Sequence, residues 1–300
     1  MAPRFEYLER RHCVCGESLP DSGRVVRTAS PWGEVRFVRC PRCGSWCQRP
    51  QVSPASLGAW YDSDDYQGSA RHRGSAYANY LADEPSRVAE AWRRYRRDLA
   101  PHLPPLGGRV LEVGCATGSL LAAVRQAGHD VAGVDLSRRF AVAARTLHGL
   151  DVQVGEFLDV NLPPAWFDVV VLLGTISNLP DLPAALSRAR TLMRPPGTLV
   201  VNFPAADSLV ARAYGRRFWM FAPSVSTFLS TSGCQIAIAA AGFTNVRVRA
   251  DWQMPSLSKL MQHARLGALA PIVEHAGLGA AAIPVPMPLP GIRLATATAP

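Results

Sequence analysis

Apolar residues in the central part of the chain form two alternating patterns. One consists of short continuous runs, which are typical of buried strands, and the other has apolar positions three and four apart, as in amphipathic helices. The runs predict strands at residues 109–113, 131–135, 151–154, 166–173 and 198–203. The spaced patterns predict helices at residues 119–127, 138–147 and 181–193. Regular alternation of strand and helix predicts a doubly wound α/β fold with a mostly parallel sheet.

The segments on either side of this alternation extend the predicted architecture. Residues 83–100 are expected to form a helix, with Val88, Trp92, Tyr95 and Leu99 on one face and arginines on the other. After the fifth strand, residues 204–229 form an insertion. The elements predicted beyond it are a helix at 230–241, a turn and strand at 242–249, a helix at 256–270 and a last strand at 292–298. We expect this last strand to be antiparallel and to complete a seven-stranded sheet.

Five of the seven cysteines lie within the first 50 residues, at positions 13, 15, 40, 43 and 47. The charged N-terminus predicts no export signal, and clustered cysteines then indicate metal ligands before disulfides. Residues 33–39 alternate as a hairpin strand would, which is typical of a zinc ribbon. We expect a structural zinc site with four tetrahedral ligands, Cys13, Cys15, Cys40 and Cys43. His12 in place of Cys13 is a close alternative, and Cys47 is expected to be a spare thiol.

The region between the cysteines and the first central strand combines aromatic and acidic residues at 60–66, together with Tyr77 and Tyr80. Two interpretations carry equal weight: a lid over a bound ligand, or aromatic packing of a connector on the main domain. We therefore expect four parts along the chain. They are a zinc ribbon at 1–52, a helical and aromatic connector or lid at 53–105, a ligand-binding domain at 106–250, and a C-terminal helix and last strand at 251–300.

The segment Val110–Ser119 contains a strand, a small-residue turn and the start of a helix. Glycines in such a turn let the backbone approach a ligand closely, and the helix N-terminus offers unpaired N–H groups. Asp135 follows roughly 20 positions later at the end of the second strand, where an acidic residue suits the hydroxyls of a ribose. The spacing Glu112-x-Gly114-x-x-x-Gly118 differs from the G-x-G-x-x-G turn of dinucleotide-binding proteins.

This motif, Leu-Glu-Val-Gly-Cys-Ala-Thr-Gly, resembles the first motif of the class I S-adenosylmethionine-dependent methyltransferases, particularly those that methylate small molecules and sugars. Residues 192–201 and 174–181 resemble later elements of the family, although Pro196 replaces a glycine, and Ser177 and Asn178 replace the usual Glu-His pair. The resemblance covers about residues 105–250. It implies a Rossmann-like sheet with strand order 3-2-1-4-5-7-6.

The resemblance also implies a set of residues that bind S-adenosylmethionine. They are Glu112, Gly114, Cys115, Ala116, Gly118, Asp135, Leu136, Glu156, Phe157 and Leu173. Glu112 and the glycine turn are expected to hold the amino-acid end of the cofactor, and Asp135 its ribose hydroxyls. Leu136 and Phe157 are expected beside the adenine, and Glu156 at the adenine amino group.

The expected activity is transfer of a methyl group to a small molecule, either a sugar or a biosynthetic intermediate with a hydroxyl or carbon acceptor. The aromatic segment 214–221 favours this acceptor class, and Tyr77, Asn178, Tyr214 and Arg217 are candidate contacts by position. The motifs identify no general base. The histidines at 72, 102, 129, 148, 263 and 275 lie in linkers, at element edges or in the tail, where a solvated role is the usual one.

Composition leaves two further hypotheses open. The net charge is +9, with Lys259 the only lysine among 32 basic residues, so an RNA base methyltransferase that uses the ribbon and the arginines of residues 93–97 is an alternative. A cofactor-binding scaffold without catalysis is the second.

No apolar run approaches the roughly 20 residues that span a bilayer, and we expect a cytoplasmic protein. The motifs carry no information on oligomeric state.

Overall fold

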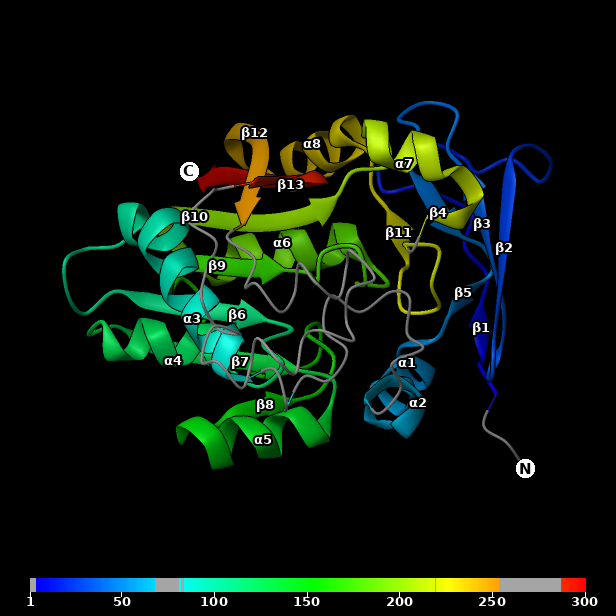
Figure 1. Ribbon diagram of the computed structural model, residues 1–300. Coiled ribbons are helices and arrows are strands. Elements are labelled where there is room, and N and C mark those ends of the chain that lie inside the picture. The colour runs from blue at the N-terminus through cyan, green and yellow to red at the C-terminus, as the bar shows by residue number, and fades with distance from the viewer. Residues whose placement is uncertain (1–3, 68–80, 82–83, 219, 254–286) are drawn as a thin grey trace.

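Two β-sheets of different kinds lie next to each other in the molecule. The computed structural model describes residues 4–67, 81, 84–218, 220–253 and 287–300. Figure 1 shows a large central sheet with helices around it and a smaller sheet, built mainly from N-terminal residues, at one end. The predicted helix at 256–270 lies outside the described residues. Among the residues described, no helix is long and apolar enough to cross a membrane.

The central sheet has seven strands and the topology that the resemblance implies. Its strands are β6 (Arg109–Val113), β7 (Asp130–Asp135), β8 (Val152–Val154), β9 (Phe167–Leu173), β10 (Met193–Pro204), β12 (Thr244–Gln253) and β13 (Met287–Ala299). They are ordered β8-β7-β6-β9-β10-β13-β12. The five strands from β8 to β10 are parallel, whereas β13 runs antiparallel to both of its neighbours. The order 3-2-1-4-5-7-6 and the antiparallel last strand are therefore confirmed.

Helices cover both faces of this sheet, and the apolar runs are continuous because both faces of each central strand are buried. The helices are α3 (Glu84–Arg94), α4 (Ser119–Gln126), α5 (Arg138–His148), α6 (Leu182–Leu192) and α8 (Thr231–Ala240). A π-helical turn, η1 (Tyr95–Leu99), and a short 3-10 turn, η2 (Ala100–His102), extend α3. In β9, Val169 and Val171 belong to the core on the α3 and α4 side, whereas Val170 and Leu172 pack with α6 and α8. This alternation is the two-residue period of a strand.

Serine and aspartate side chains begin three of these helices. Ser137 accepts a hydrogen bond from the Phe140 amide at the start of α5, and Ser230 accepts one from the Gly233 amide at the start of α8. Asp181 does the same for α6. A side-chain oxygen at this position satisfies an amide that the helix leaves unpaired. The helix starts are thus set locally, close to the predicted residues.

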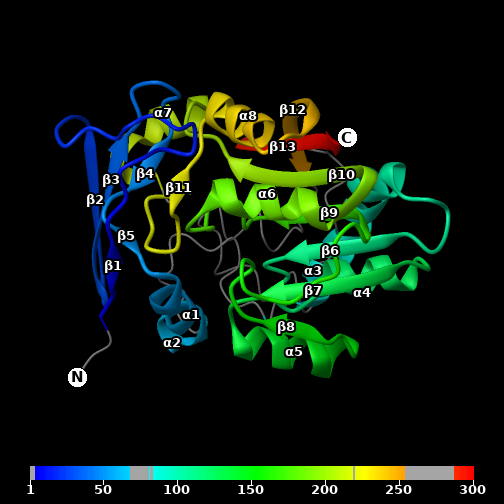
Figure 2. The same cartoon turned by 180° about the vertical axis from the view of Figure 1, so that it is seen from behind.

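The smaller sheet combines two distant parts of the sequence. Its strands are β2 (Val25–Ser30), β3 (Gly33–Arg39), β4 (Trp46–Gln48) and β11 (Thr227–Phe228), in the order β2-β3-β4-β11. A separate two-stranded pair, β1 (Tyr7–Leu8) and β5 (Gln51–Val52), lies at its side. Figure 2, the view from behind, shows β11 lying beside the N-terminal strands. Because β11 belongs to the insertion after β10, the N-terminal region is fastened to the central domain by strand pairing.

The aromatic insertion has a different role from the one its sequence favours. It forms α7 (Leu209–Tyr214), η3 (Gly215–Arg217) and then β11. Phe218 stacks on Phe228 with ring centroids 5.2 Å apart, and Phe221 lies 5.3 Å from Phe37 and 5.4 Å from Trp46. The buried aromatics of the insertion therefore pack against the N-terminal sheet.

Candidate active site

A cavity lies at the carboxyl ends of β6, β7 and β9, which is the edge where open parallel sheets bind ligands. Most of the predicted cofactor residues line it. These are Gly114, Ala116, Asp135, Leu136, Glu156, Phe157 and Leu173. The others, Glu112, Cys115 and Gly118, are buried in the strand and turn directly beside it. The structure thus brings together residues from four separate segments that the sequence motifs single out.

The glycine turn after β6 has a backbone conformation that side chains disfavour. Gly114 and Gly118 have φ angles of +74° and +77°, and Ala116 lies between them at +48°. A Cβ atom at position 114 would lie 2.2 Å from the hydroxyl oxygen of Thr175, in the loop after β9. Glycine at 114 is therefore required both by its φ angle and by close packing of two loops that line the cavity.

Glu112 is a buried carboxylate at the end of β6, and within the described residues its Oε2 atom has no hydrogen-bond partner. Burial raises the pKa of Glu112 to about 8, and the nearby charge of Arg87 offsets only part of this effect. An unpaired buried acceptor is costly unless a donor or a cation reaches it. The site is therefore suited to a positively charged group.

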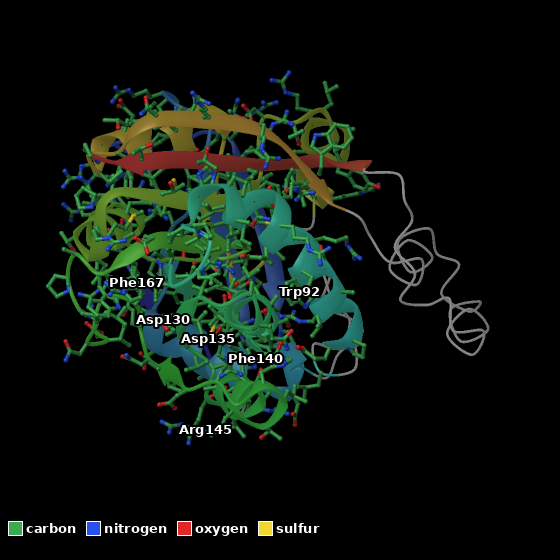
Figure 3. The ribbon with its side chains drawn as sticks, turned by 90° about the vertical axis from the view of Figure 1, so that its left-hand side faces the viewer. Trp92, Asp130, Asp135, Phe140, Arg145 and Phe167 are labelled. Atoms are coloured by element: carbon green, nitrogen blue, oxygen red, sulfur yellow. The ribbon has the colours of Figure 1, made fainter. Side chains whose placement is uncertain are left out.

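Asp135 ends β7 and is held by two backbone amides. Its Oδ2 accepts a hydrogen bond from the Ala116 amide and its Oδ1 one from the Ser137 amide, both at 2.8 Å. Burial nevertheless raises its pKa to about 6, although these two bonds oppose the shift. Each oxygen retains acceptor capacity beyond its amide bond. Figure 3 shows Asp135 and Phe140 close together in the interior, whereas Arg145 lies on the periphery.

Glu84, at the start of α3, is a residue of this site that sequence reasoning missed. Its carboxylate accepts hydrogen bonds from the hydroxyls of Thr117 (2.7 Å) and Ser119 (2.8 Å), and its Oε1 lies 2.7 Å from Nε2 of His148. Arg87, one turn later, forms an ion pair with it at 3.4 Å. Glu84 thereby ties three helices to the glycine turn. No sequence signal indicates this, because its partners Thr117, Ser119 and His148 lie 33 to 64 residues away.

The connector after the N-terminal sheet packs on the fold, and two of its tyrosines line the cavity. It forms α1 (Pro54–Asp62) and α2 (Asp64–Gln67). Trp60 is buried against Phe5 and Trp32, as expected for packing, whereas Tyr61 and Tyr66 line the cavity.

Asp62 anchors this connector beside Asp135. Its carboxylate accepts a hydrogen bond from the Ser137 hydroxyl at 2.6 Å and another from the Arg139 amide at 3.2 Å. The connector is thus fixed at the N-terminus of α5.

The remaining candidates divide between the cavity and other parts of the molecule. Glu156 lines the cavity, and burial raises its pKa. Asn178 also lines it, whereas Tyr214 and Arg217 do not. Tyr77 lies outside the described residues.

The histidines of the described chain have structural roles or lie elsewhere. His129, expected to be solvated, is buried: its Nδ1 accepts a bond from the Gly108 amide, and its Nε2 pairs with the Tyr95 hydroxyl at 2.8 Å. His148 binds Glu84. No histidine among the described residues lines the cavity, and His72, His263 and His275 lie outside those residues.

The four predicted metal ligands converge in the N-terminal region. The sulfur atoms of Cys13, Cys15, Cys40 and Cys43 all lie within 4.8 Å of one another. Two of the separations are 3.5 Å, from Cys13 to Cys43, and 3.6 Å, from Cys15 to Cys40. Four sulfurs around a tetrahedral zinc, each about 2.3 Å from the metal, would be about 3.8 Å apart. The donor set and its spacing therefore fit zinc.

The two other candidates for this site differ from the four cysteines. His12 is exposed on the bridge to Ser18 and does not belong to the cluster. Cys47 is buried within hydrogen-bonding reach of Cys13 but is not part of the four-sulfur group. The arrangement favours Cys13 over His12 as the fourth ligand.

The cysteine cluster contacts the central domain at the start of α8. The Ser230 hydroxyl donates to the carbonyl oxygen of Cys43 at 2.6 Å and lies 3.1 Å from the hydroxyl of Ser45. The Ser230 amide also donates to the Ser45 hydroxyl, at 3.0 Å. The loop that carries Cys40 and Cys43 is therefore held between the two sheets.

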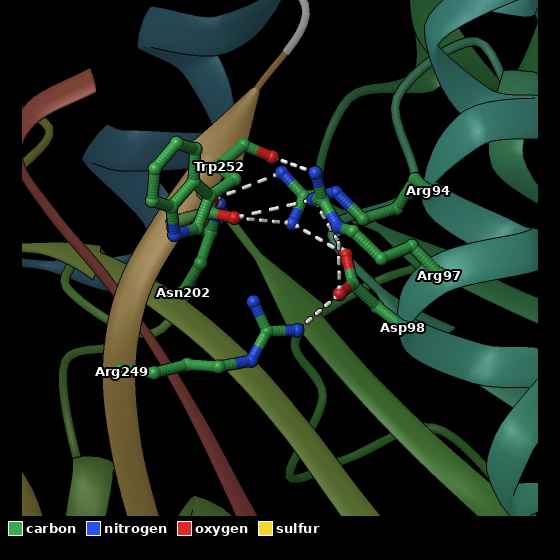
Figure 4. A network of polar contacts seen from close by, with 8 residues as sticks. Arg94, Arg97, Asp98, Asn202, Arg249 and Trp252 are labelled. Atoms are coloured by element: carbon green, nitrogen blue, oxygen red, sulfur yellow. Dashed lines mark hydrogen bonds and ion pairs between the residues drawn. The ribbon is translucent and has the colours of Figure 1, made fainter. Parts of the chain in front are cut away.

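The arginine-rich face of α3 and η1 is largely used inside the molecule. Arg94 is buried and binds Asp251 through both of its terminal nitrogens, at 2.7 and 3.0 Å, and also binds Asp98 at 2.9 Å. Arg97 and Arg249 bind Asp98 as well (Figure 4). Two arginines of the face considered for RNA binding, Arg94 and Arg97, thus have carboxylate partners within the fold. This arrangement removes their support for that hypothesis.

Comparisons with known proteins agree with this geometry. Residues 85–248 match a family model described as a methyltransferase domain. The ubiquinone biosynthesis O-methyltransferase of Xanthomonas campestris pv. campestris (strain B100) is 31% identical over 162 residues, which cover 49% of this chain and 67% of that protein.

Solved structures show the same fold. A possible histamine N-methyltransferase from Thermotoga maritima matches with a TM-score of 0.51 at 19% identity, covering 74% of this chain and 93% of that one. Phosphoethanolamine N-methyltransferase 2 from Haemonchus contortus, in complex with S-adenosyl-L-methionine, matches with a TM-score of 0.50 at 15% identity, covering 91% and 71%.

Proposed function

The chain belongs to the family of class I S-adenosylmethionine-dependent methyltransferases, and on that premise we propose that it methylates a hydroxyl or carbon atom of a small molecule. The observation that carries the cofactor assignment is the pair of buried carboxylates, Glu112 and Asp135, on either side of the glycine turn. Both have raised pKa values in the absence of a ligand. A ligand with one cationic group and a ribose diol would provide partners for both.

In the proposed site, Glu112 accepts the ammonium group of the cofactor, and Asp135 accepts its two ribose hydroxyls. The amides of Ala116 and Ser137 hold the Asp135 carboxylate in one orientation, so no reorganisation is needed on binding. Gly114 and Gly118 leave room for the amino-acid end, and Cys115 and Ala116 are small enough to permit its approach.

The remaining proposed contacts surround the adenine. Leu136 and Phe157 lie on the sides of the ring, Glu156 accepts its amino group, and Leu173 forms the floor. The bound cofactor supplies an already activated sulfonium methyl group, and the protein mainly contributes proximity, orientation and exclusion of water.

The small-molecule acceptor is supported by the cavity and by the relatives. Tyr61, Tyr66 and Asn178 add aromatic and amide surfaces to the cavity, which suit a ring or polyhydroxylated compound. Several relatives are named ubiquinone biosynthesis O-methyltransferases, and this favours a hydroxyl acceptor on a biosynthetic intermediate. A sugar hydroxyl remains within the proposal.

The experiment that tests this function is cofactor binding followed by turnover. We expect S-adenosylmethionine to bind in calorimetry and S-adenosylhomocysteine to form when hydroxylated aromatic or sugar acceptors are supplied. A folded protein that binds no S-adenosylmethionine contradicts the cofactor assignment. Cofactor binding without product from any acceptor class would instead favour the scaffold hypothesis.

We further propose four parts along the chain. Residues 1–52 form a zinc ribbon, and residues 53–105 connect it to the main domain and cover the cofactor cavity. Residues 106–250 bind the cofactor, and residues 251–300 complete the sheet.

Elemental analysis is expected to find about one zinc per chain. Cys40→Ser should lose this metal, whereas the matched variant Cys47→Ser should keep it. A metal-free chain with an unchanged melting temperature contradicts a structural zinc.

A further inference from the structure

Asn202 lies between the buried ion-pair network and the cofactor cavity. It is on β10, opposite Leu173 of β9, and is mostly buried. Its Oδ1 accepts a hydrogen bond from the Gly174 amide at 2.6 Å. Its Nδ2 donates to Oδ2 of Asp251 at 3.0 Å. The side chain therefore joins the loop after β9 to a carboxylate on β12.

The network fixes which way the Asn202 amide points. Asp251 is fully buried and is held by both terminal nitrogens of Arg94. An ionised carboxylate only accepts hydrogen bonds, so it selects the NH₂ end of Asn202. The carbonyl end is then left facing the Gly174 amide. The opposite rotation would place two acceptors together at Asp251 and two donors together at Gly174.

Asp251 lies at an irregularity of the sheet. The pairing of β12 with β13 changes register between Ala250 and Trp252. Such irregularities redirect a side chain that a regular strand would place elsewhere. Figure 4 shows Arg94 and Arg97 approaching from the helix on one side, and Asn202, Arg249 and Trp252 from the strands on the other. Arg249 and Trp252 belong to β12, the strand of Asp251.

The other end of Asn202 binds the loop that lines the cavity. Gly174 and Thr175 line it, and Gly174 has a φ of +69°. Thr175 packs directly against Gly114, where a Cβ atom would lie 2.2 Å from the Thr175 hydroxyl oxygen. A displacement of Gly174 would therefore also disturb the contact between Thr175 and the glycine turn. The bond that Asn202 accepts is thus one link between β10 and both loops.

We propose that Asn202 is a positioning residue for cofactor binding: oriented by Asp251 and Arg94, it holds Gly174 and Thr175 where the glycine turn can receive S-adenosylmethionine. This proposal rests on the proposed function. It assigns a role to the polar side chain in an otherwise apolar part of β10, residues 199–203, and it gives the arginine-rich helix α3 a part in organising the site.

The first test compares two variants of the same network. Asn202→Leu, of similar size, leaves the Gly174 amide without its acceptor, and we expect S-adenosylmethionine to bind about tenfold more weakly in calorimetry. Arg249→Gln removes a half-exposed partner of Asp98 that has no bond to Asn202, and its affinity should match the wild type. Equal affinity of Asn202→Leu and wild type overturns the proposal, as does an equal loss in both variants.

The second test places a titratable carboxyl group at position 202 and varies the pH. In Asn202→Asp, a protonated carboxyl can donate to Asp251 and still accept from the Gly174 amide, whereas an ionised one faces Asp251 as a like charge. The groups around this position are Asp251 and Arg249 on β12, and Arg94, Arg97 and Asp98 on α3 and η1. We expect the association constant of the variant for S-adenosylmethionine, divided by that of the wild type, to fall as the pH rises from 6 to 9. A ratio that does not change with pH overturns the proposal.

A ligand-free measurement separates this proposal from the proposed function. Hydrogen exchange of residues 173–178 should be faster in Asn202→Leu than in the wild type, with Arg249→Gln unchanged. If the wild type bound no S-adenosylmethionine, the proposed function would fail. The exchange result would still test whether Asn202 holds the loop, and unchanged exchange would overturn that claim.

Discussion

Two pairs of buried carboxylates lie in this fold, and their surroundings differ. Asp98 and Asp251 are fully buried side chains surrounded by Arg94, Arg97 and Arg249. Burial opposes the ionisation of Asp98, but the hydrogen bond from Arg97 and the charge of Arg94 outweigh it, so its pKa is lowered. At this network, the fold supplies its own cations.

Glu112 and Asp135 are also buried, yet their pKa values are raised, to about 8 and about 6. Arg87 is the positive group whose charge opposes both shifts, and it does not overcome the cost of burial. The difference between the two pairs indicates which one is structural. A carboxylate with internal partners stabilises the fold, whereas one held without a full set of partners is prepared for a ligand.

The largest effect should come from breaking the paired network. Arg94→Met leaves Asp251 and part of Asp98 without their main partner, and we expect a loss of about 3–5 kcal/mol in the free energy of unfolding. Urea denaturation measures it. The control Arg249→Gln, at a half-exposed position, should cost less than about 1 kcal/mol. A small loss in Arg94→Met would contradict the structural role of the network.

The next effect concerns the affinity for S-adenosylmethionine at Glu112 and Asp135. Asp135→Ala removes two charge-assisted hydrogen bonds of about 1.5–3 kcal/mol each, so S-adenosylmethionine should bind at least about 100-fold more weakly. Asp130→Asn, at the exposed opposite end of β7, is the matched control and should leave affinity unchanged. Calorimetry measures both, and equal affinities for Asp135→Ala and wild type would exclude Asp135 from the site.

A smaller effect is a pH dependence of stability. Because the folded pKa of Glu112 is raised, the folded state holds a proton that the unfolded chain releases above its ordinary pKa of 4.5. Ligand-free protein should therefore lose stability as the pH rises from about 4.5 to about 8. Thermal unfolding should show a decline of several degrees that Glu112→Gln reduces. A decline of the same size in the variant would show that other groups cause it.

The smallest effect should come from replacing Tyr66, an aromatic residue that lines the same cavity as Asp135. Tyr66 lines the cavity and contacts Phe140, with ring centroids 6.5 Å apart. Tyr66→Leu should weaken S-adenosylmethionine binding about fivefold, since an aromatic pair contributes roughly 1 kcal/mol beyond its buried area. Tyr214→Leu, at an exposed position remote from the cavity, should bind normally in the same calorimetric assay. No difference between the two variants would exclude Tyr66 as a cover.

Features that are determined by residues close together in the sequence could be predicted from it. The strand runs, the helix patterns and the spacing of Glu112, Gly114 and Asp135 each depend on neighbouring residues. The four cysteines were predictable because zinc imposes its own ligand types. The strand order and the set of cofactor residues followed from the family resemblance that the spacing of Glu112, Gly114 and Asp135 carries, and not from the local patterns alone.

The remainder depends on contacts between distant residues. Asp251 meets Arg94 across 157 positions and Asn202 across 49, and neither partner belongs to a motif. The arginines of residues 93–97 were considered for RNA binding, which needs exposed side chains. For Arg94 this is wrong, because the buried carboxylate of Asp251 on β12 binds it. The aromatic segment 214–221 favoured a small-molecule acceptor, yet its Phe218 and Phe221 pack beside the N-terminal sheet, where β11 pairs with β4.

The central claim is that the carboxylates beside the glycine turn are held partly protonated until a cationic ligand arrives. Calorimetric titration with S-adenosylmethionine at pH 7, in two buffers of different ionisation enthalpy, measures the protons exchanged on binding. The account predicts a net release of roughly half to one proton per bound cofactor, because Glu112 must ionise to receive the ammonium group. Binding without proton release, or no binding by the folded protein, would contradict it.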